Sequence, residues 1–135
     1  MNGENEIIQA LKKVKENMDS LPHDIERDVE DYIIRPILNA LGWDCSNPRL
    51  VIFQYKISNN WRVDFALLKN GQPEVIIEAK SLNTKLDSDL HEQTVKYSFA
   101  SSAKIAILTN GQTWYFYLTK EDVHWKDRKF LKFNI

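Results

Sequence analysis

Apolar side chains in the first third of the chain recur with the spacing of one helix face. They predict helices over residues 4–18 and 23–41, with Gly42 as the C-terminal stop of the second. Pro36 lies inside the second helix and lacks a backbone N–H, so it should kink the helix or require a local compensation. The first stripe consists of Ile7, Ile8, Leu11, Val14 and Met18, and the second of Ile25, Val29, Ile33, Ile37, Leu38 and Leu41.

From residue 49 onward the pattern changes to short runs rich in β-branched and aromatic residues, which are typical of strands. Asn-Gly pairs at 70–71 and 110–111 predict tight connections between neighbouring strands. The order of the elements indicates an α/β (α+β) fold in which helices flank a central mixed sheet. Strands are expected at 49–57, 61–69, 74–80, 104–109 (central), 113–119 and 129–133 (edge), and a further helix at 86–102.

The composition is that of an ordinary globular chain that forms one domain of 135 residues. The formal net charge is −1, so contact with nucleic acid requires a local patch or bound metal ions rather than an overall basic field. The single cysteine, Cys45, excludes an internal disulfide and a cysteine-based zinc site. Neither a signal-like apolar segment nor an apolar run of membrane-spanning length is present, so we expect a cytoplasmic protein without membrane contact.

Charged residues interrupt the apolar strands between residues 62 and 80. Asp64 lies on one strand of a predicted hairpin, and Glu78 and Lys80 lie on the other. Residues i and i+2 of a strand share a face, so Glu78 and Lys80 should point the same way while Ala79 points into the opposite layer.

The direction of Asp64 depends on the hairpin connection. With a two-residue Asn-Gly loop and a regular ladder, Asp64 would pair with Ile77 and face away from Glu78. The two carboxylates share a face only if the hairpin has a longer loop or a β-bulge. We predict such an irregularity, with Pro73 as its site.

Two carboxylates at close range repel each other, so both ionise only when a cation lies between them. Lys80 supplies one positive charge, and a divalent metal supplies more; oxygen ligands suit Mg²⁺, with Mn²⁺ as a substitute. Such an ion lowers the pKa of bound water and polarises a phosphoryl oxygen, and Lys80 would orient or activate the water. This combination suits hydrolysis of a phosphodiester. The alternative is that Asp64, Glu78 and Lys80 form structural ion pairs or lie on a solvated face of the sheet.

The spacing of Asp64 and the triplet Glu78-Ala79-Lys80 resembles the PD-(D/E)xK nuclease superfamily, in which these motifs lie on neighbouring strands. Val63 stands where that superfamily has proline. More specifically, residues 23–120 look like the N-terminal nuclease domain of type I restriction enzyme R subunits. The stretches that carry this resemblance are "IERDVEDYIIRPILNALGWD", "IIEAKS", "QTVKY" and "AILTNGQTWYFY".

The resemblance implies a restriction-endonuclease-like core at residues 22–120, preceded by a helical extension at 1–21. It also implies that Lys80 is the catalytic lysine. The implied catalytic residues are Asp64, Glu78, Lys80 and Glu26, and the implied metal ligands are Asp64, Glu78, the carbonyl of Ala79, and Glu26, with Glu30 as the second choice for the helix acid. The residues implied to contact nucleic acid are Gln93 and Tyr97, and Lys85 and Lys96 are candidates for holding its phosphate backbone.

We therefore expect a Mg²⁺-dependent endonuclease domain that hydrolyses DNA. The sequence contains no G-x-x-x-x-G-K-[ST] phosphate loop, so it is not itself the ATP-driven motor of an R subunit; it acts alone or meets motor and specificity subunits in trans. One alternative is a module of the same fold that holds nucleic acid without cutting. Another is a subunit-interaction protein, a homodimer included, with an exposed aromatic interface. That interface would consist of Trp114, Tyr115, Phe116, Tyr117 and Trp125.

Overall fold

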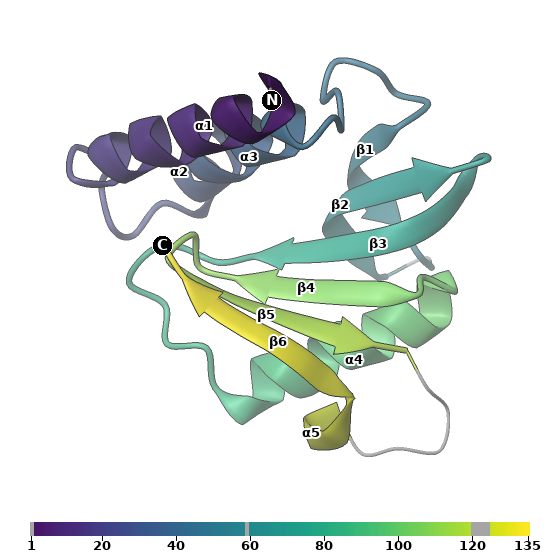
Figure 1. The fold of residues 1–135 in the computed structure, drawn as a ribbon. Helices are drawn as coiled ribbons and strands as arrows, with labels where there is room; N and C mark the ends of the chain where they lie inside the picture. Colours follow the sequence, from purple (N-terminus) through teal and green to yellow (C-terminus); the bar gives the residue numbers. More distant parts are fainter. Residues whose placement is uncertain (1, 59, 120–124) are drawn as a thin grey trace.

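One six-stranded mixed sheet forms the centre of the structure, and helices cover both of its faces (Figure 1). The computed structural model describes residues 2–58, 60–119 and 125–135. Within these ranges, no helix has the length and apolar character needed to cross a membrane. The helices are α1 (Asn2–Met18), α2 (Glu26–Val29), the π-helix η1 (Glu30–Ile34), α3 (Arg35–Ala40), α4 (Ser88–Ser101) and α5 (Trp125–Arg128). The strands are β1 (Val51–Lys56), β2 (Arg62–Lys69), β3 (Gln72–Ala79), β4 (Ile105–Thr109), β5 (Thr113–Leu118) and β6 (Lys129–Asn134).

The strands lie side by side in the order in which they occur in the sequence. Neighbours are antiparallel except β3 and β4, which run parallel. A parallel pair needs a crossover connection, and α4 provides it. The predicted α/β fold with a mixed sheet is therefore confirmed, with β4 in the middle and β6 at an edge. The short helix α5 was not predicted.

Two apolar clusters attach the helices to the two faces of the sheet. On one face, Ile33 of η1 packs in the same cluster as Ile77 and Ala79 of β3. On the other face, Val95 of α4 packs with Ile76. Ile77 and Ala79 belong to the same cluster, whereas Ile76 belongs to the other. This confirms that Ala79 shares the layer of Ile77.

The aromatic residues of β5 belong to the core and do not form the exposed interface that was considered. Trp114 and Tyr117 are only 3% and 1% exposed, and each belongs to one of the two clusters. Tyr115 and Phe116 are partly buried. The side chain of Trp125 lies outside the described part of the chain. The alternative of an exposed aromatic interface is thus contradicted at β5, because this strand lies inside the sheet and packs on both sides.

The second helix widens into a π turn just before Pro36. The N–H of Arg35 donates to the carbonyl of Glu30, five residues earlier, and α3 carries Pro36 in its first turn. Proline donates no hydrogen bond, and its ring crowds the carbonyl four residues before it, so a regular helix would be disrupted at this point. The expected compensation is confirmed, and it occurs in the segment that carries Glu30.

The β2–β3 hairpin contains a β-bulge. Leu68 of β2 pairs with Pro73, but the residue before it, Leu67, pairs with Val75. Glu74 is therefore left without a partner on β2. An additional residue on one strand is the defining feature of a bulge. The predicted irregularity is thus present, directly after Pro73.

The bulge changes the partner of Asp64. The loop itself has two residues, 70–71, and a regular ladder from it would put Asp64 opposite Ile77. Instead, Phe65 pairs with Ile77, so Asp64 comes opposite Glu78. The two carboxyl groups that the sequence singled out are therefore cross-strand neighbours.

Gly111 allows the turn between β4 and β5 to approach the second helix closely. A Cβ at this position would lie 2.8 Å from Ile33 Cδ1 and 3.1 Å from Val29 Cγ1, and the φ angle is +90°. We expect Gly111→Ala to lower the free energy of unfolding by about 2–4 kcal/mol, because it combines backbone strain with overpacking. Chemical denaturation measures this loss.

Gly71→Ala is the matched control for that experiment. Its φ angle is +76°, but nothing lies within 4 Å of the added Cβ, so only the backbone strain of about 1 kcal/mol remains. Equal losses for the two variants would contradict the close packing of the second helix against Gly111.

Candidate metal centre

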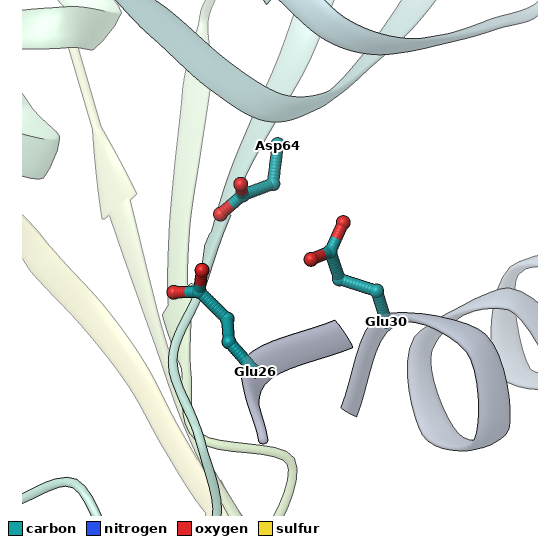
Figure 2. Close-up of side chains that lie close together, drawn as sticks. All are labelled: Glu26, Glu30 and Asp64. Carbon is teal, nitrogen blue, oxygen red and sulfur yellow. The ribbon is translucent and has the colours of Figure 1, made fainter. Parts of the chain in front are cut away.

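Three carboxyl groups from separate elements converge near the start of β2. Glu26 of α2, Glu30 of η1 and Asp64 of β2 each place one oxygen within 4.8 Å of the others. Figure 2 shows the three side chains pointing toward one another, two from the helical segment and one from the strand. Glu26 and Glu30 are four residues apart, the spacing of neighbours on one helix face. Packing of this helix on the sheet brings both acids to Asp64.

Glu78 contacts Asp64 from the neighbouring strand. The N–H of Asp64 donates to Oε1 of Glu78 at 3.2 Å, and the N–H of Ala79 donates to Oδ2 of Asp64 at 2.7 Å. Each carboxylate therefore accepts a hydrogen bond from the backbone of the opposite strand. These two bonds fix both side chains at the point where the bulge has aligned them.

The strand β2 twists sharply at Asp64. Val63 packs in the cluster beside α4, whereas Phe65 packs in the cluster beside α1, α2 and α3. Because residues two apart on a flat strand share a face, the strand must rotate between them. Gln54 of β1 has a φ angle of +52°, and its Nε2 donates to Oδ1 of Asp64 at 3.1 Å. Gln54 was not predicted, since a glutamine within a strand pattern gives no signal of left-handed backbone.

Lys80 follows β3 directly and reaches the acids. Its N–H donates to the carbonyl of Thr109 on β4 at 2.8 Å, and its Nζ lies 3.7 Å from Oε1 of Glu26. The Lys80 and Glu26 side chains are 29% and 44% exposed, so this ion pair contributes little to stability. Its importance lies in bringing an ammonium group beside the cluster.

The environment of the cluster disfavours ionised carboxylates. Burial, followed by the charge of Asp64, raises the pKa of Glu78 to about 8. The same two causes raise the pKa of Glu30 to about 7. Burial also raises the pKa of Asp64 and of Glu26, and Lys80 only partly opposes these shifts. At neutral pH the cluster therefore retains protons unless a further cation neutralises it.

The donor atoms fit a divalent cation. Carboxylate oxygens are the hard ligands that Mg²⁺ and Mn²⁺ prefer, and the excess of negative charge is what such an ion neutralises. Among the described residues, the group with mutually close oxygens is Glu26, Glu30 and Asp64. This group includes Glu30, the second choice for the helix acid in the sequence analysis. Glu78 lies beside Asp64 but outside the group. Ligation by Glu78 and by the carbonyl of Ala79 stays a prediction.

Three of the four residues predicted to contact nucleic acid, Gln93, Lys96 and Tyr97, lie on α4, which covers the opposite side of the sheet from α2 (Figure 1). Gln93 Nε2 donates to the hydroxyl of Tyr97 at 2.6 Å. Tyr97 also packs against Trp61, in the turn before β2. Lys96 is exposed on the same helix, and Lys85 is exposed in the segment before it. The structure thus connects Tyr97 to the start of β2, and contact of these residues with nucleic acid stays a prediction.

We expect Glu78→Gln to stabilise the metal-free protein above pH 7. A glutamate in an unfolded chain has a pKa of about 4.3, whereas burial gives Glu78 a pKa of about 8 in the folded protein. Between these values the folded state binds more protons, so the free energy of unfolding falls as the pH rises from about 5 to about 8. Gln keeps an acceptor for the Asp64 N–H and removes the titration, which should raise the free energy of unfolding at pH 9 by about 1–2 kcal/mol.

Thermal unfolding followed from pH 5 to pH 9 measures this effect. Glu92→Gln, which replaces an exposed acid on α4, is the control and should leave the pH profile unchanged. Identical profiles for the wild-type protein and Glu78→Gln would contradict a buried, uncompensated carboxyl group at this position.

Comparison with known proteins identifies the family of the chain. The family described as "Type I restriction enzyme R protein N terminus (HSDR_N)" matches residues 34–131. The match includes Asp64, Glu78 and Lys80 and begins after the two helix acids. Searches among curated proteins and among solved structures gave no significant match. The match extends over more than half of the chain, and the chain therefore belongs to the family of type I restriction enzyme R protein N termini.

Proposed function

We propose that the chain is a metal-dependent endonuclease domain of the PD-(D/E)xK type, which hydrolyses phosphodiester bonds of DNA. Its family supports a role in restriction, since the R protein is part of a type I restriction enzyme. The observation that carries the proposal is the convergence of Asp64, Glu78 and Lys80 with two helix acids at one bulged hairpin. Solvated structural ion pairs would not explain a cluster of carboxyl groups that exceeds the positive charge that Lys80 brings to it.

A phosphodiester cannot approach these carboxylates without a cation, because both carry negative charge. Mg²⁺ fits the oxygens of Glu26, Glu30 and Asp64, and Mn²⁺ should replace it. When bound, such an ion polarises a phosphoryl oxygen and lowers the pKa of a bound water. Asp64 is already oriented for ligation, because hydrogen bonds from Ala79 and Gln54 hold both of its oxygens.

Glu78 and Lys80 would act on the reacting groups. Burial raises the pKa of Glu78 to about 8 in the metal-free protein, and a bound cation would lower it, so the ionised carboxylate would be available to accept a proton or to bind the ion. The ammonium of Lys80 would orient the attacking water and stabilise the negative charge that develops on the phosphate. Its ion pair with Glu26 keeps the Lys80 side chain at the cluster.

The DNA strand would run from the acid cluster toward α4. Gln93 and Tyr97 would contact it there, and the exposed ammonium groups of Lys85 and Lys96 would bind its phosphates. The 135 residues contain no phosphate-loop motif for ATP, so the ATP-driven motor of a type I enzyme would lie outside them, and a motor and a specificity subunit are the partners that we propose. The alternative, a module that binds DNA without cutting it, keeps the same fold and contacts.

Cleavage assays test the proposal directly. Labelled single-stranded, double-stranded or branched DNA should be cut in the presence of Mg²⁺ or Mn²⁺, and EDTA should prevent cutting. Lys80→Ala and Asp64→Ala should each lower the rate by about 100-fold or more, since each removes a charge that acts at the reaction centre. Lys69→Ala, at the exposed far end of β2, is the control and should retain activity. Cutting that survives both site substitutions would contradict the assigned site, and intact DNA in every assay would favour the non-cleaving module.

Calorimetric titration with Mg²⁺ tests the ligand set independently of cleavage. Glu30→Gln and Asp64→Asn should each weaken binding about tenfold or more, whereas Glu92→Gln should not. The apparent affinity of the wild-type protein should rise from pH 6 to pH 8, because the ion binds ionised carboxylates and the pKa of Glu30 is raised to about 7 by burial. Unchanged affinity in Glu30→Gln, or affinity that falls with pH, would exclude this site.

A further inference from the structure

Trp61 presents a supported aromatic ring at the surface. Its ring packs against Tyr97 of α4, with centroids 5.3 Å apart and planes inclined by 41°, yet the residue remains 39% exposed. Its backbone is fixed in the turn: Ile57 N–H donates to the Trp61 carbonyl at 2.8 Å, and Trp61 N–H donates to the Ser58 carbonyl at 3.3 Å. Tyr97 is held in turn by Gln93. One side of the Trp61 ring is therefore buttressed, and part of its surface is open to solvent.

A surface hollow of about 280 Å³ adjoins this aromatic pair. Its lining includes the carboxylates of Asp89 and Glu92, which accept hydrogen bonds from the amino groups of bases, and the ammonium of Lys96, which can bind an adjoining phosphate. The amide of Gln93 offers both a donor and an acceptor. The hollow thus suits a flat, uncharged, hydrogen-bonding group, which is the description of a nucleobase. Its lining residues are Trp61, Asp89, Glu92, Gln93, Lys96 and Tyr97.

The aromatic pair lies close to the metal centre along β2. Asp64 follows Trp61 by three residues, which at about 3.3 Å per residue is about 10 Å, or about three nucleotides of a stacked strand. Arg62 lies between them: its Nη1 donates to the carbonyl of Gln54 at 3.1 Å, and the Gln54 side chain donates to Asp64. The guanidinium is therefore well located to bind a phosphate that connects a stacked base with the reaction centre.

We propose that Trp61, supported by Tyr97, stacks an unpaired base of the substrate, so that the domain prefers single-stranded DNA to a continuous duplex. This inference rests on the proposed function, because it names the substrate class of the same site. In a duplex, neighbouring base pairs cover both faces of every internal base. A side-chain ring can stack only on a base that has no such neighbour, as in a single strand.

Binding of fluorescein-labelled DNA tests the inference. The background is Lys80→Ala with Mg²⁺, so that cleavage does not interfere, and the probes are a 12-nucleotide strand and the duplex of the same sequence. Trp61→Leu should weaken binding of the single strand about 5- to 100-fold and change duplex binding less than twofold. Trp61→Phe keeps an aromatic ring and should lose far less. Phe130→Leu, an exposed aromatic of β6 that is 48% exposed, is the matched control and should change neither.

A second readout remains available if Trp61→Leu does not fold. Binding of the single strand should quench tryptophan fluorescence in the otherwise intact protein, and Trp61→Phe should abolish most of that quenching. Equal weakening for single strand and duplex, or quenching that persists in Trp61→Phe, would overturn the inference.

Cleavage by the wild-type protein separates this result from the proposed function: cutting without a Trp61-dependent preference overturns the inference alone. Trp61-dependent binding without cutting overturns the endonuclease alone.

Discussion

The additional residue in β3 is the constraint on which the site depends. Glu74 bulges out of the β2–β3 ladder and aligns Asp64 with Glu78. Without it, the two-residue period of a strand would direct the two carboxylates to opposite faces of the sheet. Lys104, directly before β4, anchors the bulge, because its N–H donates to the Glu74 carbonyl at 3.0 Å and its Nζ lies 3.4 Å from Oε1 of Glu74. The register of the site is therefore held by the central strands as well as by the hairpin.

Apolar packing brings the negative charges together. Val29 and Ile33 are fully buried on the helix that carries the two acids, and both lie against Gly111 in the turn after β4. The helix cannot move away from the sheet without exposing these side chains, so Glu30 is held near Asp64 despite their mutual repulsion. Apolar packing thus holds Glu30 where its charge is unfavourable, and the raised pKa of Glu30, caused first by burial and then by Asp64, reflects this conflict. Such local conflicts are expected where a bound cation completes the site.

Local patterns were sufficient for the longer helices, the strands and the bulge, but not for the short helix α5. The Asn-Gly pair indicated where the hairpin loop lies. A shared face for Asp64 and Glu78 then required an irregularity in the ladder, and Pro73 was the residue near the loop that could cause one. Long-range packing was not accessible in this way. The left-handed backbone of Gln54 and the convergence of Glu26 and Glu30 on Asp64 involve residues that are far apart in the sequence. The burial of the aromatic run at 114–117 was likewise not evident from local patterns, because it results from packing against neighbouring strands and helices.

The position of the metal ion is the most direct test of this account. Crystals of the protein soaked in Mn²⁺ allow the ion to be located by its anomalous X-ray scattering, without reference to any activity. The account predicts a peak at coordinating distance from the carboxylates of Asp64 and Glu30. A map without a peak at saturating Mn²⁺, or a peak bound elsewhere on the protein, would contradict it.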